Sequence, residues 1–280
     1  MSTSTEIAPG QTTRPQWSRY RHPRSTIRFA VLLVVLSLLG YSIAFLNIDL
    51  ARVLGAFPRL AEILATRYVP PDLEYISQVE FIRSVVRTIE MSLLGGFAGV
   101  LISIPLAWLA ASNITISRRV LYPLGRLAIM GSRSIHETIW TILFVTMLGF
   151  GMLAGTLALT VFCIGFAGKL FADELEAIDM GPVEALRAAG ANPLQVFQYA
   201  VLPQVRVAFT GIAIYTWDVA FRAATVVGFF GGGGMGWYLK RTTQQLESTR
   251  VAAILLIIII LVLLAEIGSG WLRRKISTMR

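Results

Sequence analysis

The chain has few charged residues for its length. Only 15% of its 280 residues are Asp, Glu, Lys or Arg, whereas a soluble protein carries about 25% charged residues. Such a chain lacks the polar side chains needed to face water on all sides. An ordinary soluble enzyme is therefore excluded.

Cysteine and histidine are almost absent. Cys163 is the single cysteine, and His22 and His136 are the only histidines. These numbers exclude an intrachain disulfide and leave too few residues for the Cys/His spacings of a zinc site. The sequence also lacks the G-x-x-x-x-G-K-[ST] phosphate loop and a Ser/His/Asp hydrolase context. If ATP is used, a partner must supply the nucleotide site.

Hydrophobic residues make up 55% of the chain and are concentrated in long runs. A run of about 20 apolar residues spans the hydrocarbon core of a bilayer as a helix. We therefore predict an all-α polytopic membrane protein with six transmembrane helices. The predicted spans are 29–48, 86–111, 124–148, 152–171, 207–230 and 251–272.

The third and fourth spans come from one uncharged run, Thr138 to Gly168. As a single helix of 31 residues it would be about 47 Å long, well beyond one bilayer core. The run must therefore turn, and Gly149-Phe150-Gly151 together with Gly155 provide residues suited to a turn.

The basic residues predict the orientation. A polar N-terminal tail (1–26), the membrane region (27–272) and a basic C-terminal tail (273–280) follow one another. Loops on the side of the termini hold 15 of the 25 Lys and Arg, and the opposite loops hold 7. Because cytoplasmic loops are enriched in Lys and Arg, both termini are expected in the cytoplasm. The protein is expected in the inner or plasma membrane. Its basic residues are explained by this orientation, and we expect no nucleic-acid binding. Loop 49–84, long enough for a surface helix, then faces outward and loop 172–203 inward.

The inward loop has the signals of a helix-turn-helix. Gly181-Pro182 can open a helix, Glu184 lies in its first turn, and Gly190 is suited to a left-handed cap. Asn192-Pro193 can begin a second helix. A small apolar patch at one helical face is expected to point away from the membrane toward a partner. Its members are Val183, Leu186 and Ala189.

The spacing of this loop resembles the cytoplasmic coupling loop of ABC importer permeases, whose pattern is E-A-A-x3-G-x9-I-x-L-P. Leu186 replaces the third residue of that pattern and Ala200 replaces its Ile. The alternative is an ordinary loop between two helices. The matching residues are Glu184, Ala185, Gly190, Leu202 and Pro203.

Scattered stretches between residues 70 and 236 resemble the phosphonate branch of these permeases. They include Pro70-Pro71-Asp72, Arg133 with Glu137 and Trp140, and Asp218 with Arg222 before a glycine run. The branch has Pro, Glu and Asn where this chain has His136, Asp218 and Ala220. These departures fall at pore positions that the resemblance implies. Phosphonate, phosphate and phosphite are not distinguished by the sequence, because the resemblance implies that selectivity lies largely in the binding protein.

The resemblance implies the type I ABC importer fold and a set of partners. These are a second copy of the chain, two cytoplasmic ATP-binding subunits that hold ATP and Mg, and an extracytoplasmic substrate-binding protein. The chain itself would bind no cofactor or metal and catalyse no bond change. It would act by alternating access, moving a phosphonate or a related phosphorus oxyanion to the cytoplasm.

Two predicted intramembrane pairs, Arg133/Glu137 and Asp218/Arg222, carry the charge within the spans. Each is spaced i, i+4, close enough on a helix for mutual neutralisation. They are either structural ion pairs or part of an anion path, because the planar Arg side chain can match two oxyanion oxygens at once. His136 is interpreted as a packed, hydrogen-bonded residue in preference to a proton relay.

A glycine run near the outer end of the fifth span is interpreted as a flexible outer gate or a hinge. It comprises Gly231, Gly232, Gly233, Gly234 and Gly236. Two other functions remain open at this point: an ion-coupled secondary transporter using Glu137, Asp218 or His136, and a membrane enzyme acting on phosphate esters.

Overall fold

A computed structural model describes residues 23–46 and 50–277, which divide into two units at residues 63 and 64. The first unit contains helix α1 (Pro23–Phe45) and helix α2 (Leu50–Ile63). α1 matches the first predicted span, although residues 47–48 at the end of that prediction lie outside the described residues. α2 confirms a helix in loop 49–84.

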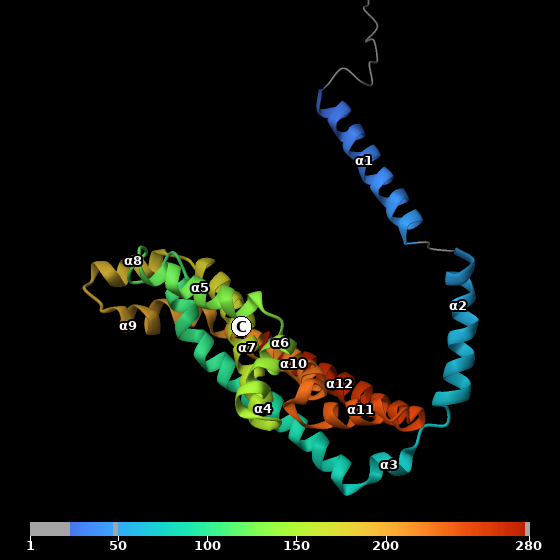
Figure 1. Cartoon of the computed structure of the whole chain (residues 1–280). Helices are drawn as coiled ribbons and strands as arrows, with labels where there is room; N and C mark the ends of the chain where they lie inside the picture. Colours follow the sequence, from blue (N-terminus) through green and yellow to red (C-terminus); the bar gives the residue numbers. More distant parts are fainter. Residues whose placement is uncertain (1–22, 47–49, 278–280) are drawn as a thin grey trace, which may run out of the picture. The chain divides into compact units, whose positions relative to one another are not determined.

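The second unit is a bundle of helices without strands among its described residues (Figure 1). Its elements are a π-helical turn (Leu64–Tyr68), α3 (Leu73–Ser77), α4 (Val79–Ala110), α5 (Leu121–Ser134), α6 (Glu137–Leu148), α7 (Met152–Glu176), α8 (Gly181–Ala188), α9 (Pro193–Val196), a π-helical turn (Phe197–Val201), α10 (Leu202–Val227), a third π-helical turn (Gly228–Gly232), α11 (Met235–Gln244) and α12 (Ser248–Ser277).

Glycines on α4 bring the central helices into contact. α4 packs extensively against α7, and α10 packs against both. A Cβ placed on Gly95 would lie 2.7 Å from Cβ of Leu159, and Gly99 meets Cys163 in the same way. Small residues four apart let two helix backbones approach closely, as membrane helices commonly do.

Five helices of the described chain are long and apolar enough to cross a membrane, and they correspond to five of the six predicted spans. The prediction of a continuous third span, 124–148, is wrong. The chain forms α5 up to Ser134, passes through extended backbone at Ile135 and His136, and begins α6 at Glu137. Apolar content alone missed this break, because His136 acts as an N-cap and its Nδ1 accepts the Thr138 N–H at 3.3 Å.

The turn between α6 and α7 falls where it was predicted, at Gly149 and Gly151, which have φ of 86° and 148°. Gly155 was wrongly included in it. That glycine lies inside α7, where its missing side chain makes room for Met91 and Gly232.

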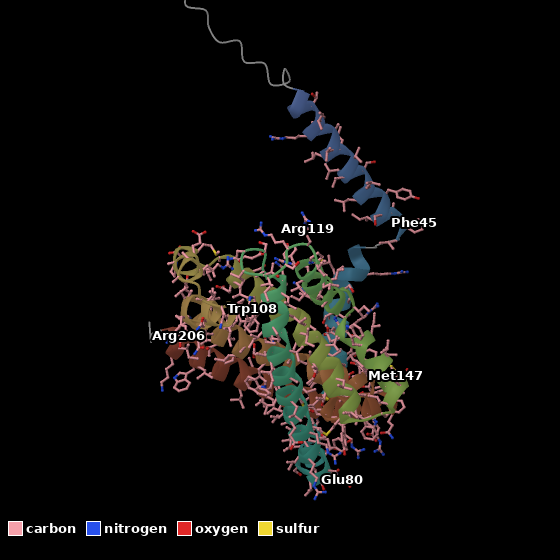
Figure 2. All side chains as sticks on the ribbon, turned by 90° about the vertical axis from the view of Figure 1, so that its left-hand side faces the viewer. Phe45, Glu80, Trp108, Arg119, Met147 and Arg206 are labelled. Carbon is pink, nitrogen blue, oxygen red and sulfur yellow. The ribbon has the colours of Figure 1, made fainter. Side chains whose placement is uncertain are left out.

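The second unit has two distinct ends. α8 and α9 lie at one end, and α3 and α11 lie toward the other (Figure 1). In Figure 2, Glu80 and Trp108 mark the two ends of α4, with Arg119 beyond Trp108. We call the end that contains α8 and α9 the coupling-loop end, and the end that contains the third π-helical turn and α11 the glycine end.

Candidate functional site

The first arm of the predicted helix-turn-helix is α8. Asp179 Oδ1 accepts the Gly181 N–H at 2.9 Å, and Pro182 lies in the first turn. The helix ends before Gly190, whose φ is 85°, and the Ala191 N–H donates to the Leu186 carbonyl at 3.0 Å. The left-handed cap predicted at Gly190 is therefore present.

The second arm begins with the predicted cap at Asn192. Its side chain accepts the Gln195 N–H at 2.9 Å, and the Gln195 side chain accepts the Asn192 N–H at 2.9 Å. This reciprocal pair is a capping box. Pro193 is in the first turn of α9, as its fixed φ favours.

The apolar patch predicted on α8 does not point away from the protein. Val183 is completely buried in a cluster that includes Leu175 and Val201, and Leu186 packs against that cluster. Only Ala189 is exposed. Burial of apolar area within the chain outweighs its exposure to a partner that has yet to bind, so the outward face of α8 presents other residues. They are Glu184, Ala185, Arg187 and Ala188.

Gln204 joins the two arms, although its sequence position gave no sign of this role. Its amide donates to the carbonyls of Asp179 (3.1 Å) and Ala200 (2.8 Å), and its Oε1 accepts the Asp179 N–H at 2.9 Å. Leu202 and Pro203 immediately precede it and open α10.

A second connection fixes the base of the coupling loop. Glu176, the last residue of α7, accepts the Ser112 N–H at 2.9 Å and an Arg126 N–H at 2.7 Å. Asn113 Nδ2 donates to the Leu175 carbonyl at 2.7 Å. These partners are 50 to 64 positions apart in sequence, so sequence spacing gave no signal for them.

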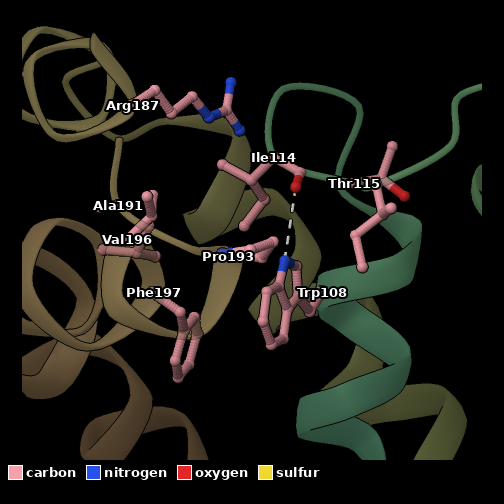
Figure 3. Close-up of a pocket in the computed structure, with 10 residues that line it drawn as sticks. Trp108, Ile114, Thr115, Arg187, Ala191, Pro193, Val196 and Phe197 are labelled. Carbon is pink, nitrogen blue, oxygen red and sulfur yellow. Dashed lines mark hydrogen bonds between the residues drawn. The ribbon is translucent and has the colours of Figure 1, made fainter. Parts of the chain in front are cut away.

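A cavity of about 340 Å³ is lined by residues of the coupling loop and of the end of α4 (Figure 3). The Trp108 and Phe197 rings stack with centroids 4.8 Å apart, and Trp108 Nε1 donates to the Ile114 carbonyl at 3.4 Å. Arg187 of α8 also lines the cavity. α8 therefore lies beside a space that is not closely packed.

Within α10, the structure confirms the Asp218/Arg222 ion pair, with Arg222 Nη2 2.7 Å from Asp218 Oδ2. The Asp218 side chain is only 3% exposed, whereas that of Arg222 is 42% exposed. Asp218 Oδ1 has no hydrogen-bond partner within the described chain. The carboxylate is therefore inside the bundle and the guanidinium at its surface.

The predicted Arg133/Glu137 pair is absent from the ion pairs of the described residues. Because the helix is interrupted between them, Arg133 ends α5 while Glu137 begins α6, and i, i+4 spacing no longer brings their side chains together. Arg133 lies against Gly165 and is exposed. Glu137 instead lies 3.4 Å from Nε2 of His136.

Polar groups hold the interruption against α7. The Ser132 hydroxyl donates to the Val161 carbonyl, and Trp140 Nε1 donates to the Ser132 carbonyl at 3.3 Å. His136 Nδ1 contacts the Thr138 hydroxyl at 2.5 Å, but its side chain is 64% exposed, so the expectation of a packed histidine is only half met.

The glycine run forms a tight turn between α10 and α11. Gly231, Gly233 and Gly234 have φ of 112°, 88° and 68°, a region that favours glycine. A Cβ on Gly232 would lie 3.0 Å from Cα of Gly155, and Gly236 is packed against α10. The run is thus closely packed in this conformation, and its role as gate or hinge stays a prediction.

The fold defines the class: a polytopic helical membrane protein with a short helix-turn-helix, α8 and α9, between two of its membrane-length helices. The chain belongs to the family described as the inner membrane component of binding-protein-dependent transport systems, which it matches over residues 79–278.

Sequence comparison finds relatives that are named as transport permeases. It is 41% identical over 184 residues to the phosphite transport system permease protein PtxC of Stutzerimonas stutzeri, covering 66% of each chain. It is 36% identical over 182 residues to the phosphate-import permease protein PhnE of Mycolicibacterium smegmatis, covering 65% of this chain and 34% of that protein. The chain thus spans about two thirds of the first relative and about one third of the second.

The fold of the chain is similar to that of a solved ABC transporter structure. An inward-facing MetNI methionine ABC transporter chain matches with a TM-score of 0.62 and 25% identity, over 70% of this chain and 95% of that chain. The all-α, type I permease architecture expected from the sequence is therefore confirmed.

Proposed function

We propose that this chain is the permease subunit of an ATP-driven importer for phosphonate or a related phosphorus oxyanion. The observation that carries the proposal is the coupling loop: α8 begins beside Asp179, which bonds to Gly181 and to Gln204 of α10, ends in the left-handed cap at Gly190, and exposes Glu184 and Ala185. Such a short rigid helix is suited to transmit the movement of a partner. The phosphite and phosphate names of the relatives support the substrate class.

The transporter would consist of two copies of the chain, two cytoplasmic ATPases and an extracytoplasmic binding protein. ATP and Mg would be held by the ATPases, because this sequence lacks the G-x-x-x-x-G-K-[ST] phosphate loop. Closure of the ATPases would move α8 and convert an inward-facing cavity to an outward-facing one. Family membership gives no support to an ion-coupled transporter or a phosphate-ester enzyme.

Arg222 and Arg133 are the residues we assign to the anion path. The planar guanidinium can bind two oxygens of a phosphorus oxyanion, and both arginine side chains are exposed in the single chain. Asp218 would temper the attraction of Arg222, because conduction needs binding weak enough to permit release. Glu137, which forms no ion pair with Arg133, stays a candidate for the path at the start of α6.

The function is tested by reconstituting the chain in proteoliposomes with the ATPase and binding protein encoded beside it. We expect ATP-dependent uptake of radiolabelled phosphate, phosphite or methylphosphonate. An importer that takes up none of them while hydrolysing ATP would contradict the substrate assignment and leave the permease assignment intact.

The role of the ion pair needs a second comparison. Removing one partner of a buried pair leaves an uncompensated charge, whereas removing both does not. If the pair is only structural, the double variant Asp218→Asn with Arg222→Gln should recover most of the substrate uptake that the single variant Arg222→Gln loses. If Arg222 serves the anion, the double variant folds and hydrolyses ATP but still fails to transport.

A further inference from the structure

At the glycine end, α11 has two chemically different faces. The apolar face packs into a buried cluster with Phe81 and Phe221 through Met235, Tyr238 and Leu239. The opposite face carries aromatic, cationic and amide side chains at spacings i, i+3, i+4 and i+7, which place them side by side. They are Trp237, Lys240, Arg241 and Gln244.

This second face lines a pocket. Phe150 from the α6–α7 turn and Gly231 from the glycine run complete a cavity of about 330 Å³. The two segments are joined by a hydrogen bond from the Gly151 N–H to the Gly231 carbonyl at 3.1 Å. The pocket is therefore built where the glycine run meets the turn between α6 and α7.

The charge of the pocket is uncompensated within the described chain. Its lining contains Lys240 and Arg241 and no carboxylate, and neither cation forms an ion pair with a described residue. Arg250, a few residues further along, is instead 2.7 Å from Glu247 and 3.2 Å from Asp72. Arg241 also lies over the Trp237 ring, with Cζ 5.6 Å from its centroid, which limits the orientations of the guanidinium.

We propose that this pocket is an outer receiving site for a phosphorus oxyanion before it enters the membrane path. The Arg241 guanidinium can bind two oxyanion oxygens, the Lys240 ammonium can neutralise a further charge, and the Gln244 amide can donate to a third oxygen. The Trp237 and Phe150 rings flank the two cations in the lining of the pocket. The proposal rests on the proposed function and on an extracytoplasmic location of the glycine end.

The position explains why such a site would be useful. A small anion released by a binding protein would be held beside Gly231, next to the segment that has to rearrange if the glycine run is a gate. Two cations without a carboxylate bind more strongly than the Asp218/Arg222 pair, so the pocket would concentrate the anion at the entrance and the paired arginine would pass it on.

The test measures anion binding to the complex of permease and ATPases in nanodiscs, by scintillation proximity with ³²P-phosphate and ³⁵S-sulfate. All variants carry Asp218→Asn with Arg222→Gln, so that this pair contributes nothing. Lys240→Gln with Arg241→Gln should weaken phosphate binding at least tenfold. The matched control, Arg119→Gln with Arg206→Gln, removes the same charge from exposed positions on loops and helices outside the pocket and should bind as its parent does.

Equal phosphate affinity in the pocket variant and its parent would overturn the proposal. Unchanged phosphate affinity with lost co-sedimentation of the binding protein would also overturn it and assign the two cations to a protein interface. If the pocket binds sulfate and phosphate but the unmodified transporter takes up no phosphorus oxyanion, the anion site stands and the proposed substrate fails.

Discussion

The two ends of the second unit are held together by different physical means. At the coupling-loop end, side chains cap the backbone: Asn192 and Gln195 pair reciprocally, and Gln204 bridges two segments. At the glycine end, backbone meets backbone, as at Gly155 and Gly232. The Asn192/Gln195 cap leaves a recognisable residue pattern because its partners are three residues apart. The partners of Gln204 and of the closely packed glycines lie far away in sequence.

The largest effect concerns the sides of the membrane on which the two ends lie. Cys163 is fully buried, so the native chain should resist membrane-impermeant thiol reagents in intact cells. Arg119→Cys at the coupling-loop end and Leu246→Cys beyond α11 should label from opposite faces, each all-or-none. Labelling of both from outside would reverse the assignment of one end.

The next largest effect is at the coupling cap. Gly190→Val places a β-branched residue at φ of 85°, which costs about 1–2 kcal/mol or more and should distort α8. We expect at least a tenfold loss of substrate-stimulated ATP hydrolysis with normal insertion. Ala189→Val is the matched control, because Ala189 is exposed and has φ of −77°. Equal coupling in both variants would refute the assignment of the loop.

At the glycine end, adding a side chain to a closely packed glycine should lower the free energy of unfolding. A Cβ on Gly236 would lie 2.5 Å from the Phe229 nitrogen and 2.8 Å from the Gly228 carbonyl carbon, so Gly236→Ala should cost about 3 kcal/mol and lower Tm. Gly211→Ala is the control, since open space surrounds that glycine and alanine favours a helix. A Gly236→Ala chain as stable as the control would show that the turn repacks readily.

The smallest effect is a gain in stability. Leu246 has φ of 58° at the end of α11, where glycine is favoured, and its side chain is 86% exposed. Leu246→Gly should therefore stabilise the chain by about 1 kcal/mol, seen as a small rise in Tm, with Leu246→Asn intermediate. A fall in Tm would mean that the exposed side chain makes a stabilising contact in the assembled transporter.

Local signals in the sequence were sufficient for the helical class, five of the spans and both caps of the coupling loop. Long apolar runs must become helices in a bilayer, because no water is present to satisfy their backbone groups. Gly190 and Asn192 act within a few residues of their own position, so their conformations follow from local chemistry.

The tertiary structure alone decided three other features. The chain breaks between Arg133 and Glu137 because Ser132 and Trp140 bond across the interruption and toward α7, and this separates a pair whose spacing suits a continuous helix. The α8 apolar patch turns inward because a buried cluster is available to receive Val183. The cations of α11 line a pocket together with Phe150, about ninety residues earlier in the chain, because the fold brings the α6–α7 turn beside α11.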